Sequence, residues 1–139
     1  MSLRVLFAAV VVCGLLLGVK VAMATAEKVV DTKELAKERR GAARDAYQFA
    51  WDEFKPFDLS KGDGEKVYRW SRRWMEAERD LATTKAERVA ALQGHLERMK
   101  KLEEEVQGYA RGTIPFQQLA ATKFYRAEAE TWLAEAKGK

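Results

Sequence analysis

A long segment without proline constrains the fold of this chain more than any other feature. Residues 65–111 are mostly strong helix formers, and apolar side chains recur among them at alternating spacings of three and four. The members of this apolar stripe are Val67, Trp70, Trp74, Ala77, Leu81, Val89, Leu92, Leu96, Met99, Leu102, Val106 and Tyr109. This is the spacing of a coiled-coil seam. The pattern therefore predicts one long helix over about Glu65–Arg111, with one face packed against other helices.

Two positions could interrupt this helix. The sequence Thr83-Thr84-Lys85 places β-branched and charged residues where the apolar stripe should continue. Gly94 costs about 1 kcal/mol relative to alanine in a helix interior. A break at either position would give a compact bundle of three or four helices instead of an elongated one.

Two shorter segments also carry helical spacing. The first covers about Asp31–Phe54, between a capping-box variant that starts at Asp31 and the helix-breaking Lys55-Pro56. The other runs from Pro115 to about Ala136, with Pro115 in its first turn. Their apolar stripes are Ala36, Ala43, Tyr47, Ala50 and Phe54, and Ala121, Tyr125, Ala129, Trp132 and Ala136. Because the links at 55–64 and after Gly112 are short, we predict an all-α fold: an elongated antiparallel coiled-coil hairpin of three helices with a long central helix.

The N-terminus has the marks of a secretory signal peptide. Arg4 precedes an apolar run over Val5–Val19, and small residues that suit cleavage follow at Ala24 and Ala26. We therefore predict a signal peptide over 1–24 and a helical coiled-coil domain over 25–139, which places the protein in the periplasm or cell envelope. The alternative is a retained N-terminal anchor in the inner membrane, formed by residues 5–26. Removing residues 1–24 would take away two cations and no acid, which lowers the net charge from +4 to +2.

The composition excludes several classes of protein. Hydrophobic residues make up 47% of the chain, too many for simple disorder, and a single Cys excludes a disulfide scaffold. A near-balanced charge disfavours nucleic-acid binding, which needs many phosphate-neutralising cations.

Catalytic and metal-binding motifs are also missing from the sequence. With one His and no Cys outside the signal segment, the chain cannot form a multi-His or Cys/His metal site. We interpret His95 as a flanking residue of the helix, and Glu103-Glu104-Glu105 as part of a solvated face. We predict no enzyme activity, no cofactor and no small-molecule substrate, because no general base has an identifiable partner.

The most unusual local feature combines aromatic and basic residues. Tyr68, Arg69, Trp70, Arg73 and Trp74 lie within seven positions, and the two Trp share a helix face because they are four residues apart. The simpler interpretation is two core tryptophans flanked by solvated arginines. The alternative is an interaction patch for anionic lipid, an envelope polymer or a protein partner.

The segment from Tyr109 through Gly112, Thr113 and Pro115 to Leu119 resembles a signature of the outer-membrane efflux (TolC-like) family. In that family, a Tyr-x-x-Gly ends one long helix, a polar turn follows, and a Leu-x-Ala stretch opens the return helix. The resemblance covers residues 106–136 and departs from the pattern at Gln118, where an acid is usual. It implies a helical hairpin with its turn at Tyr109, Gly112, Thr113 and Pro115, of the kind that meets partner proteins in the periplasm.

These observations favour a non-catalytic exported protein of the cell envelope that acts in binding or scaffolding. A protein partner, self-association or a contact with the membrane surface would suit its apolar stripes. Two alternatives are a periplasmic chaperone or stress protein that shields apolar clients, and an accessory component of envelope transport.

Overall fold

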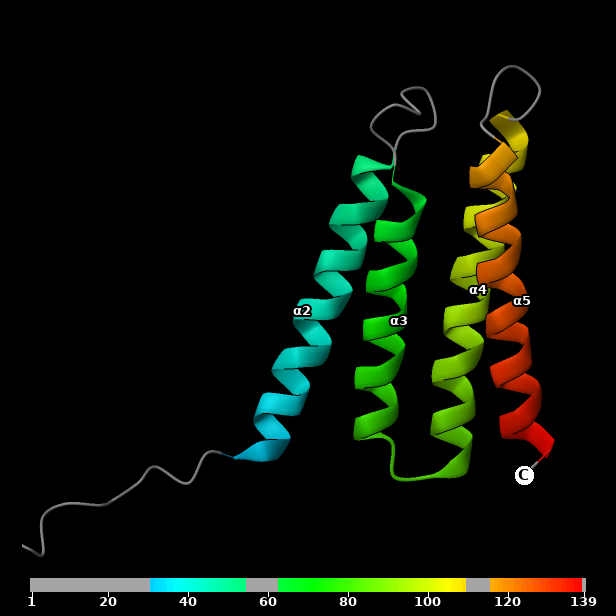
Figure 1. Ribbon diagram of the computed structural model, residues 1–139. Coiled ribbons are helices and arrows are strands. Elements are labelled where there is room, and N and C mark those ends of the chain that lie inside the picture. Colours follow the sequence, from blue (N-terminus) through cyan, green and yellow to red (C-terminus); the bar gives the residue numbers. More distant parts are fainter. Residues whose placement is uncertain (1–30, 55–62, 110–115, 139) are drawn as a thin grey trace, which may run out of the picture. The chain divides into compact units, whose positions relative to one another are not determined.

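The computed structural model describes residues 31–54, 63–109 and 116–138, and helices are the only regular secondary structure there. Four helices form one compact unit, Thr32–Lys139 (Figure 1). They are α2 (Thr32–Glu53), α3 (Gly64–Leu81), α4 (Lys85–Tyr109) and α5 (Phe116–Gly138). The predicted all-α class is confirmed. The prediction of three helices with a long central one is wrong, because the expected long helix is divided into α3 and α4.

The division lies at the threonine pair and is stabilised by a capping box. The carboxylate of Glu87 accepts hydrogen bonds from the backbone N–H groups of Thr83 and Thr84, at 2.7 and 3.0 Å. In return, the Thr84 hydroxyl oxygen accepts from the backbone N–H of Glu87 at 3.2 Å. Ala82 adopts an extended backbone conformation that ends α3. Gly94, the other suspected weak point, lies inside α4. The chain therefore turns where side chains can satisfy the free N–H groups of a new helix.

The two ends of α2 fix its direction relative to α3. Arg39, near the start of α2, forms an ion pair with Asp80, near the end of α3. Glu53, at the end of α2, pairs with Lys66, near the start of α3. The two helices are therefore antiparallel. Asp63 caps the N-terminus of α3 by accepting hydrogen bonds from the next backbone N–H groups.

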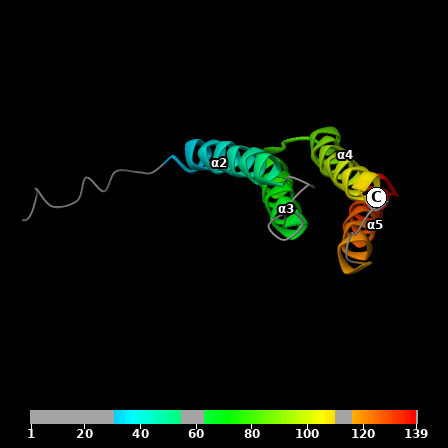
Figure 2. The same ribbon diagram turned by 90° about the horizontal axis from the view of Figure 1, so that it is seen from above.

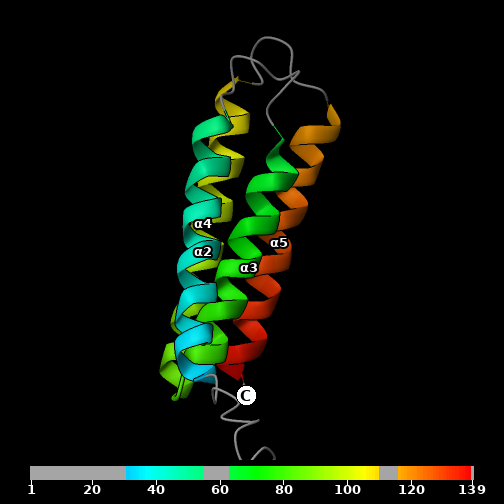
Figure 3. The same ribbon diagram turned by 90° about the vertical axis from the view of Figure 1, so that its left-hand side faces the viewer.

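The later helices also alternate in direction. Ser71 of α3 contacts His95 of α4. Leu81, at the end of α3, lines the same cleft as Glu87, near the start of α4, so α3 and α4 are antiparallel. His95 stacks against Trp132 of α5, while Glu103 pairs with Arg126, so α4 and α5 are antiparallel. The four axes run roughly along one direction (Figure 3).

The helices pack in chain order and do not close into a ring. α2 packs on α3, α3 on α4 and α4 on α5, with a smaller contact between α3 and α5 (Figure 2). Within the described ranges, the backbones of α2 and α5 are not in contact. Grooves lie beside α3 and α4, one of them bordered by α5 and another by α2.

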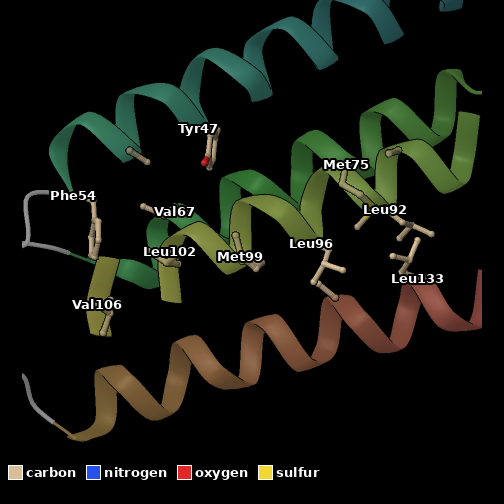
Figure 4. Close-up of a cluster of buried hydrophobic side chains, with 13 residues drawn as sticks. Tyr47, Phe54, Val67, Met75, Leu92, Leu96, Met99, Leu102, Val106 and Leu133 are labelled. Carbon is tan, nitrogen blue, oxygen red and sulfur yellow. The ribbon is translucent and has the colours of Figure 1, made fainter. Parts of the chain in front are cut away.

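α4 supplies the centre of the hydrophobic core. Most of its predicted stripe is confirmed as buried: Leu92, Leu96, Met99, Leu102 and Val106 (Figure 4). On α2, Ala43, Tyr47, Ala50 and Phe54 are buried as predicted.

The buried face of α3 is rotated relative to its predicted stripe. Val67, Ser71 and Met75, which follow one another at intervals of four, are at most 1% exposed. Trp70 and Trp74 are half-buried at one margin of this face, next to α2. The two large indoles therefore lie to one side of the buried face, while a serine occupies its centre.

Several predictions concern residues outside the described ranges. The signal peptide at 1–24, the alternative anchor at 5–26, most of the loop at 55–64, and Gly112, Thr113 and Pro115 belong to this group. Among the helices that the structure describes, none is both long and apolar enough to cross a membrane.

The capping box should contribute measurably to stability. We expect Thr84→Ala to lower the free energy of unfolding by about 1 kcal/mol, since N-cap replacements typically cost that amount. Thr131→Ala is the matched control, because Thr131 is exposed in mid-helix and bonds only the preceding turn. Urea denaturation of the three proteins measures the difference. Equal stabilities of Thr84→Ala and Thr131→Ala would contradict the role of the box.

Candidate functional site

A buried polar network joins α3 to α4. We use this name for Ser71, His95 and Arg98. The Ser71 hydroxyl lies 2.8 Å from Nδ1 of His95, and both residues are 0% exposed. Nε of Arg98 donates to the same hydroxyl oxygen at 2.8 Å, and a terminal guanidinium nitrogen donates to the Ser71 carbonyl at 3.3 Å.

These partners allow the Ser71 hydroxyl to donate to His95. A guanidinium can only donate hydrogen bonds, so the Ser71 hydroxyl hydrogen remains available for Nδ1 of His95. In the tautomer that uses this donor, Nδ1 accepts and the neutral imidazole carries its hydrogen on Nε2. That buried Nε2 has no hydrogen-bond partner among the described residues.

Aromatic rings enclose the buried polar network. The His95 ring stacks against Trp132, with centroids 5.8 Å apart, and lies 6.1 Å from the ring of Tyr68. The Arg98 guanidinium carbon lies 4.0 Å from the centroid of Trp74, which is close enough for a cation–π interaction. Ser71 and His95 are thus held between apolar surfaces that exclude water, while Arg98 is half-buried.

Burial keeps His95 neutral. Desolvation, followed by the positive charges of Arg98 and Arg72, lowers the pKa of His95 from 6.5 to about 3. His95 was predicted to flank the helix, and that prediction is wrong, because α4 buries the imidazole between α3 and α5. The serine at the centre of α3 is the sequence signal that could have indicated a buried polar partner.

A serine bonded to a histidine is a frequent catalytic pair, but here the geometry serves another role. The Ser71 hydroxyl bonds to Nδ1 of His95 and accepts from Arg98, and neither Ser71 nor His95 lines any of the described clefts. A substrate could reach the hydroxyl only if the helices separated. What the network can do chemically is hold α3 against α4.

The depressed pKa makes stability depend on pH. His95 binds a proton more readily in the unfolded chain, at a pKa near 6.5, than in the folded one, near 3. The stability that neutral His95 contributes to the fold is therefore present above pH 6.5 and is lost as the pH falls towards 3. Between pH 6.5 and 5, we expect the free energy of unfolding to fall by about 2 kcal/mol.

Denaturation in urea across this range measures the effect, and His95→Gln is the control because glutamine does not titrate. The variant should show a much flatter profile between pH 6.5 and 5. If the natural chain and the variant have the same pH dependence, His95 is not the group responsible.

Removing the shared hydroxyl should also destabilise the fold. In Ser71→Ala, Nδ1 of His95 loses its partner while it remains enclosed, and Nε of the half-buried Arg98 loses its partner as well. A buried polar group without a partner costs about 1–3 kcal/mol. We expect a loss in that range by thermal or urea denaturation. A change below about 0.5 kcal/mol, the usual effect of a surface substitution, would contradict the importance of the network.

A second set of polar contacts links α5 to its neighbours. The Tyr68 hydroxyl of α3 donates to Glu128 at 2.5 Å, and the Tyr68 ring stacks on Tyr125 at a centroid distance of 4.1 Å. Glu103 of α4 accepts from Arg126 at 2.5 Å and is only 7% exposed. The prediction of a solvated face is therefore wrong at Glu103, which packs under α5.

The residues of the predicted interaction patch have separate surroundings. Tyr68 faces α5, whereas Trp74 packs on Tyr47 of α2, with centroids 5.6 Å apart. Arg69 is exposed and pairs with Glu65 of its own helix. Only Trp70 and Arg73 remain together at the surface, where the guanidinium lies 4.7 Å from the indole centroid and both line a cleft beside α2.

The turn residues predicted from the resemblance are described only in part. Tyr109 is the last residue of α4, and Gly112, Thr113 and Pro115 lie outside the described ranges. Their place in a hairpin turn stays a prediction.

A cleft between α3, α4 and α5 carries an excess of positive charge. Its volume is about 560 Å³, and we call it the basic cleft. Its lining combines four cations, two acids and an apolar floor: Arg72, Arg79, Lys85, Arg88; Glu76, Glu135; and Met75, Val89, Leu92, Trp132, Ala136. Sequence reasoning did not find it, because its cations come from two helices that were expected to be one.

A second groove lies between α2 and α4 over Trp74. Its lining has three cations, Arg44, Arg98 and Lys101, and two acids, Asp45 and Glu97, so its charges are more evenly balanced. Among the described residues, no group of three or more His, Cys, Asp or Glu side chains could hold a metal ion.

Comparison with known proteins gives no relatives. The chain matches no protein-family model, no curated protein and no solved structure. The geometry of the helices is therefore the basis for the functional proposal.

Proposed function

We propose that this chain is an exported, non-catalytic protein of the cell envelope that acts by binding or scaffolding. One observation carries the proposal: the described helices leave two grooves lined by aromatic and charged side chains, one between α3, α4 and α5 and one between α2 and α4. Concave surfaces of this kind are where proteins bind ligands and partners. The Ser–His pair, by contrast, is enclosed in the core, away from these grooves.

Export is the part of the proposal that rests on the sequence of residues 1–26. We expect the chain, expressed with its natural N-terminus, to be recovered from the periplasm with a mass that begins after Ala24 or Ala26. Fractionation and intact-mass measurement test this. Recovery of the full-length mass in the membrane fraction would favour the anchored alternative, and recovery from the cytoplasm would contradict export.

Proximity crosslinking from the exported chain tests partner binding and location together. A reproducible envelope partner that is lost on Trp70→Ala and Arg73→Ala substitution would support binding through their shared surface. Sedimentation over a range of concentrations tests scaffolding by self-association, which a strictly monomeric protein would contradict. An accessory role in envelope transport rests on the TolC-like resemblance alone, and it predicts a transporter among the crosslinked proteins.

A chaperone role is the second candidate, and exposed aromatic rings favour it. Phe49 on α2 and Phe124 on α5 are 60% and 61% exposed, respectively. Apolar rings in water can contact the exposed surfaces of unfolded clients. An assay of client aggregation tests the idea, and failure to suppress aggregation at a stoichiometric excess would contradict it.

A further inference from the structure

We propose that the basic cleft binds a single-chain anionic amphiphile, with its apolar chain on the floor and its anionic head among the cations of the rim. The inference deepens the proposed binding role by naming a ligand class. Ligand binding in the cleft does not depend on export, so this inference and the proposed export can fail separately.

The rim of the cleft has unbalanced positive charge. Arg72 pairs with Glu76 at 2.9 Å. The other three cations, Arg79, Lys85 and Arg88, are exposed and form no ion pair with any residue in the part of the chain that the structure describes. An anionic group would relieve the repulsion among these like charges and gain attraction from each of them.

The floor of the cleft is apolar. Met75 and Leu92 are almost fully buried there, and Trp132 and Ala136 of α5 border them. The Arg72 guanidinium carbon lies 5.3 Å from the Trp132 ring centroid, so a cation stands directly above this apolar surface. A ligand with both an apolar chain and a negative head matches this arrangement better than a free anion, which would leave the apolar floor exposed to water.

The size of the cleft favours a small molecule over a helical partner. A volume of about 560 Å³ falls within the range of small-molecule sites. One turn of an α-helix with its side chains fills about 400–600 Å³, given its pitch and diameter. The cleft could therefore accept only about one turn of a partner helix, whereas it could enclose a flexible alkyl chain.

Titration calorimetry of the full chain with dodecyl phosphate, below the concentration at which micelles form, tests the proposal. We expect saturable binding of one molecule per chain. Dodecyl maltoside, which has the same chain and no charge, should bind at least ten-fold more weakly, and so should inorganic phosphate, which has no chain.

Charge reversal locates the site. We expect Lys85→Glu combined with Arg88→Glu to weaken binding about ten-fold or more, because attraction at two exposed sites becomes repulsion. Both positions lie near the N-terminus of α4, where acidic residues suit the helix dipole, so the variant should fold. Lys123→Glu is the matched control, since Lys123 is exposed on α5 outside the cleft. It should bind as the natural chain does.

A second variant tests the floor without changing charge. Ala136→Trp near the end of α5 should fill the apolar part of the cleft and weaken the binding of dodecyl phosphate at least ten-fold. The apolar segment at Val5–Val19 is present in every variant, so a difference between variants reports on the cleft alone.

Other results would overturn the proposal. Equal binding of the neutral amphiphile would show that the cations are not used, and equal binding of inorganic phosphate would show that the floor is not used. A glutamate-rich peptide that displaces dodecyl phosphate at equal concentration would identify an acidic protein partner instead. Unchanged binding in the charge-reversal variant would place the ligand elsewhere on the chain.

Discussion

The hydroxyl of Ser71 is the contact on which the packing of the two central helices depends. A serine is small enough to let α3 approach α4, and its hydroxyl bonds both Arg98 and His95 at the same time. Without this sharing, an imidazole and a guanidinium would face an apolar interior with unsatisfied polar groups. The buried polar network therefore fixes which faces of α3 and α4 meet, in a core whose leucine and methionine side chains could tolerate other arrangements.

The orientation of α3 has consequences at the surface. Because Ser71 and Met75 face inward, the arginines between and beside them face outward, and Trp70 and Trp74 lie together on the side of α3 that borders α2. The other side of α3 supplies Arg72 and Arg79 to the basic cleft. The enclosed network and the open cleft are thus two results of the same helix rotation.

The sequence predicted the helical class, the bounds of α2 to within about a residue, and most of the buried positions of α2 and α4. These features follow from local periodicity. The division between α3 and α4 was recognised only as an alternative, although Thr84 and Glu87 have the spacing of a capping box. Glycine at position 94 was weighed equally with the threonines, yet α4 continues through it, because packing against α3 and α5 outweighs a cost of about 1 kcal/mol.

The candidate sites were harder to predict than the helices. The burial of His95 depends on a serine that is 24 positions away in the sequence, and the burial of Glu103 depends on Arg126 of another helix. The basic cleft requires α3 and α4 to be folded back on each other, which a single long helix excludes. Periodicity describes one helix at a time, so it could not indicate which charges from different helices would gather.

The helices differ in how many neighbours they pack against, which implies an order in which they detach from the bundle. α4 is enclosed by α3 and α5, whereas the backbone of α2 packs against α3 alone. Fewer apolar contacts hold an outer helix, so local opening should begin there. A pull applied at the N-terminus would therefore detach α2 first, uncover the rings of Tyr47 and Trp74, and leave the inner three helices joined.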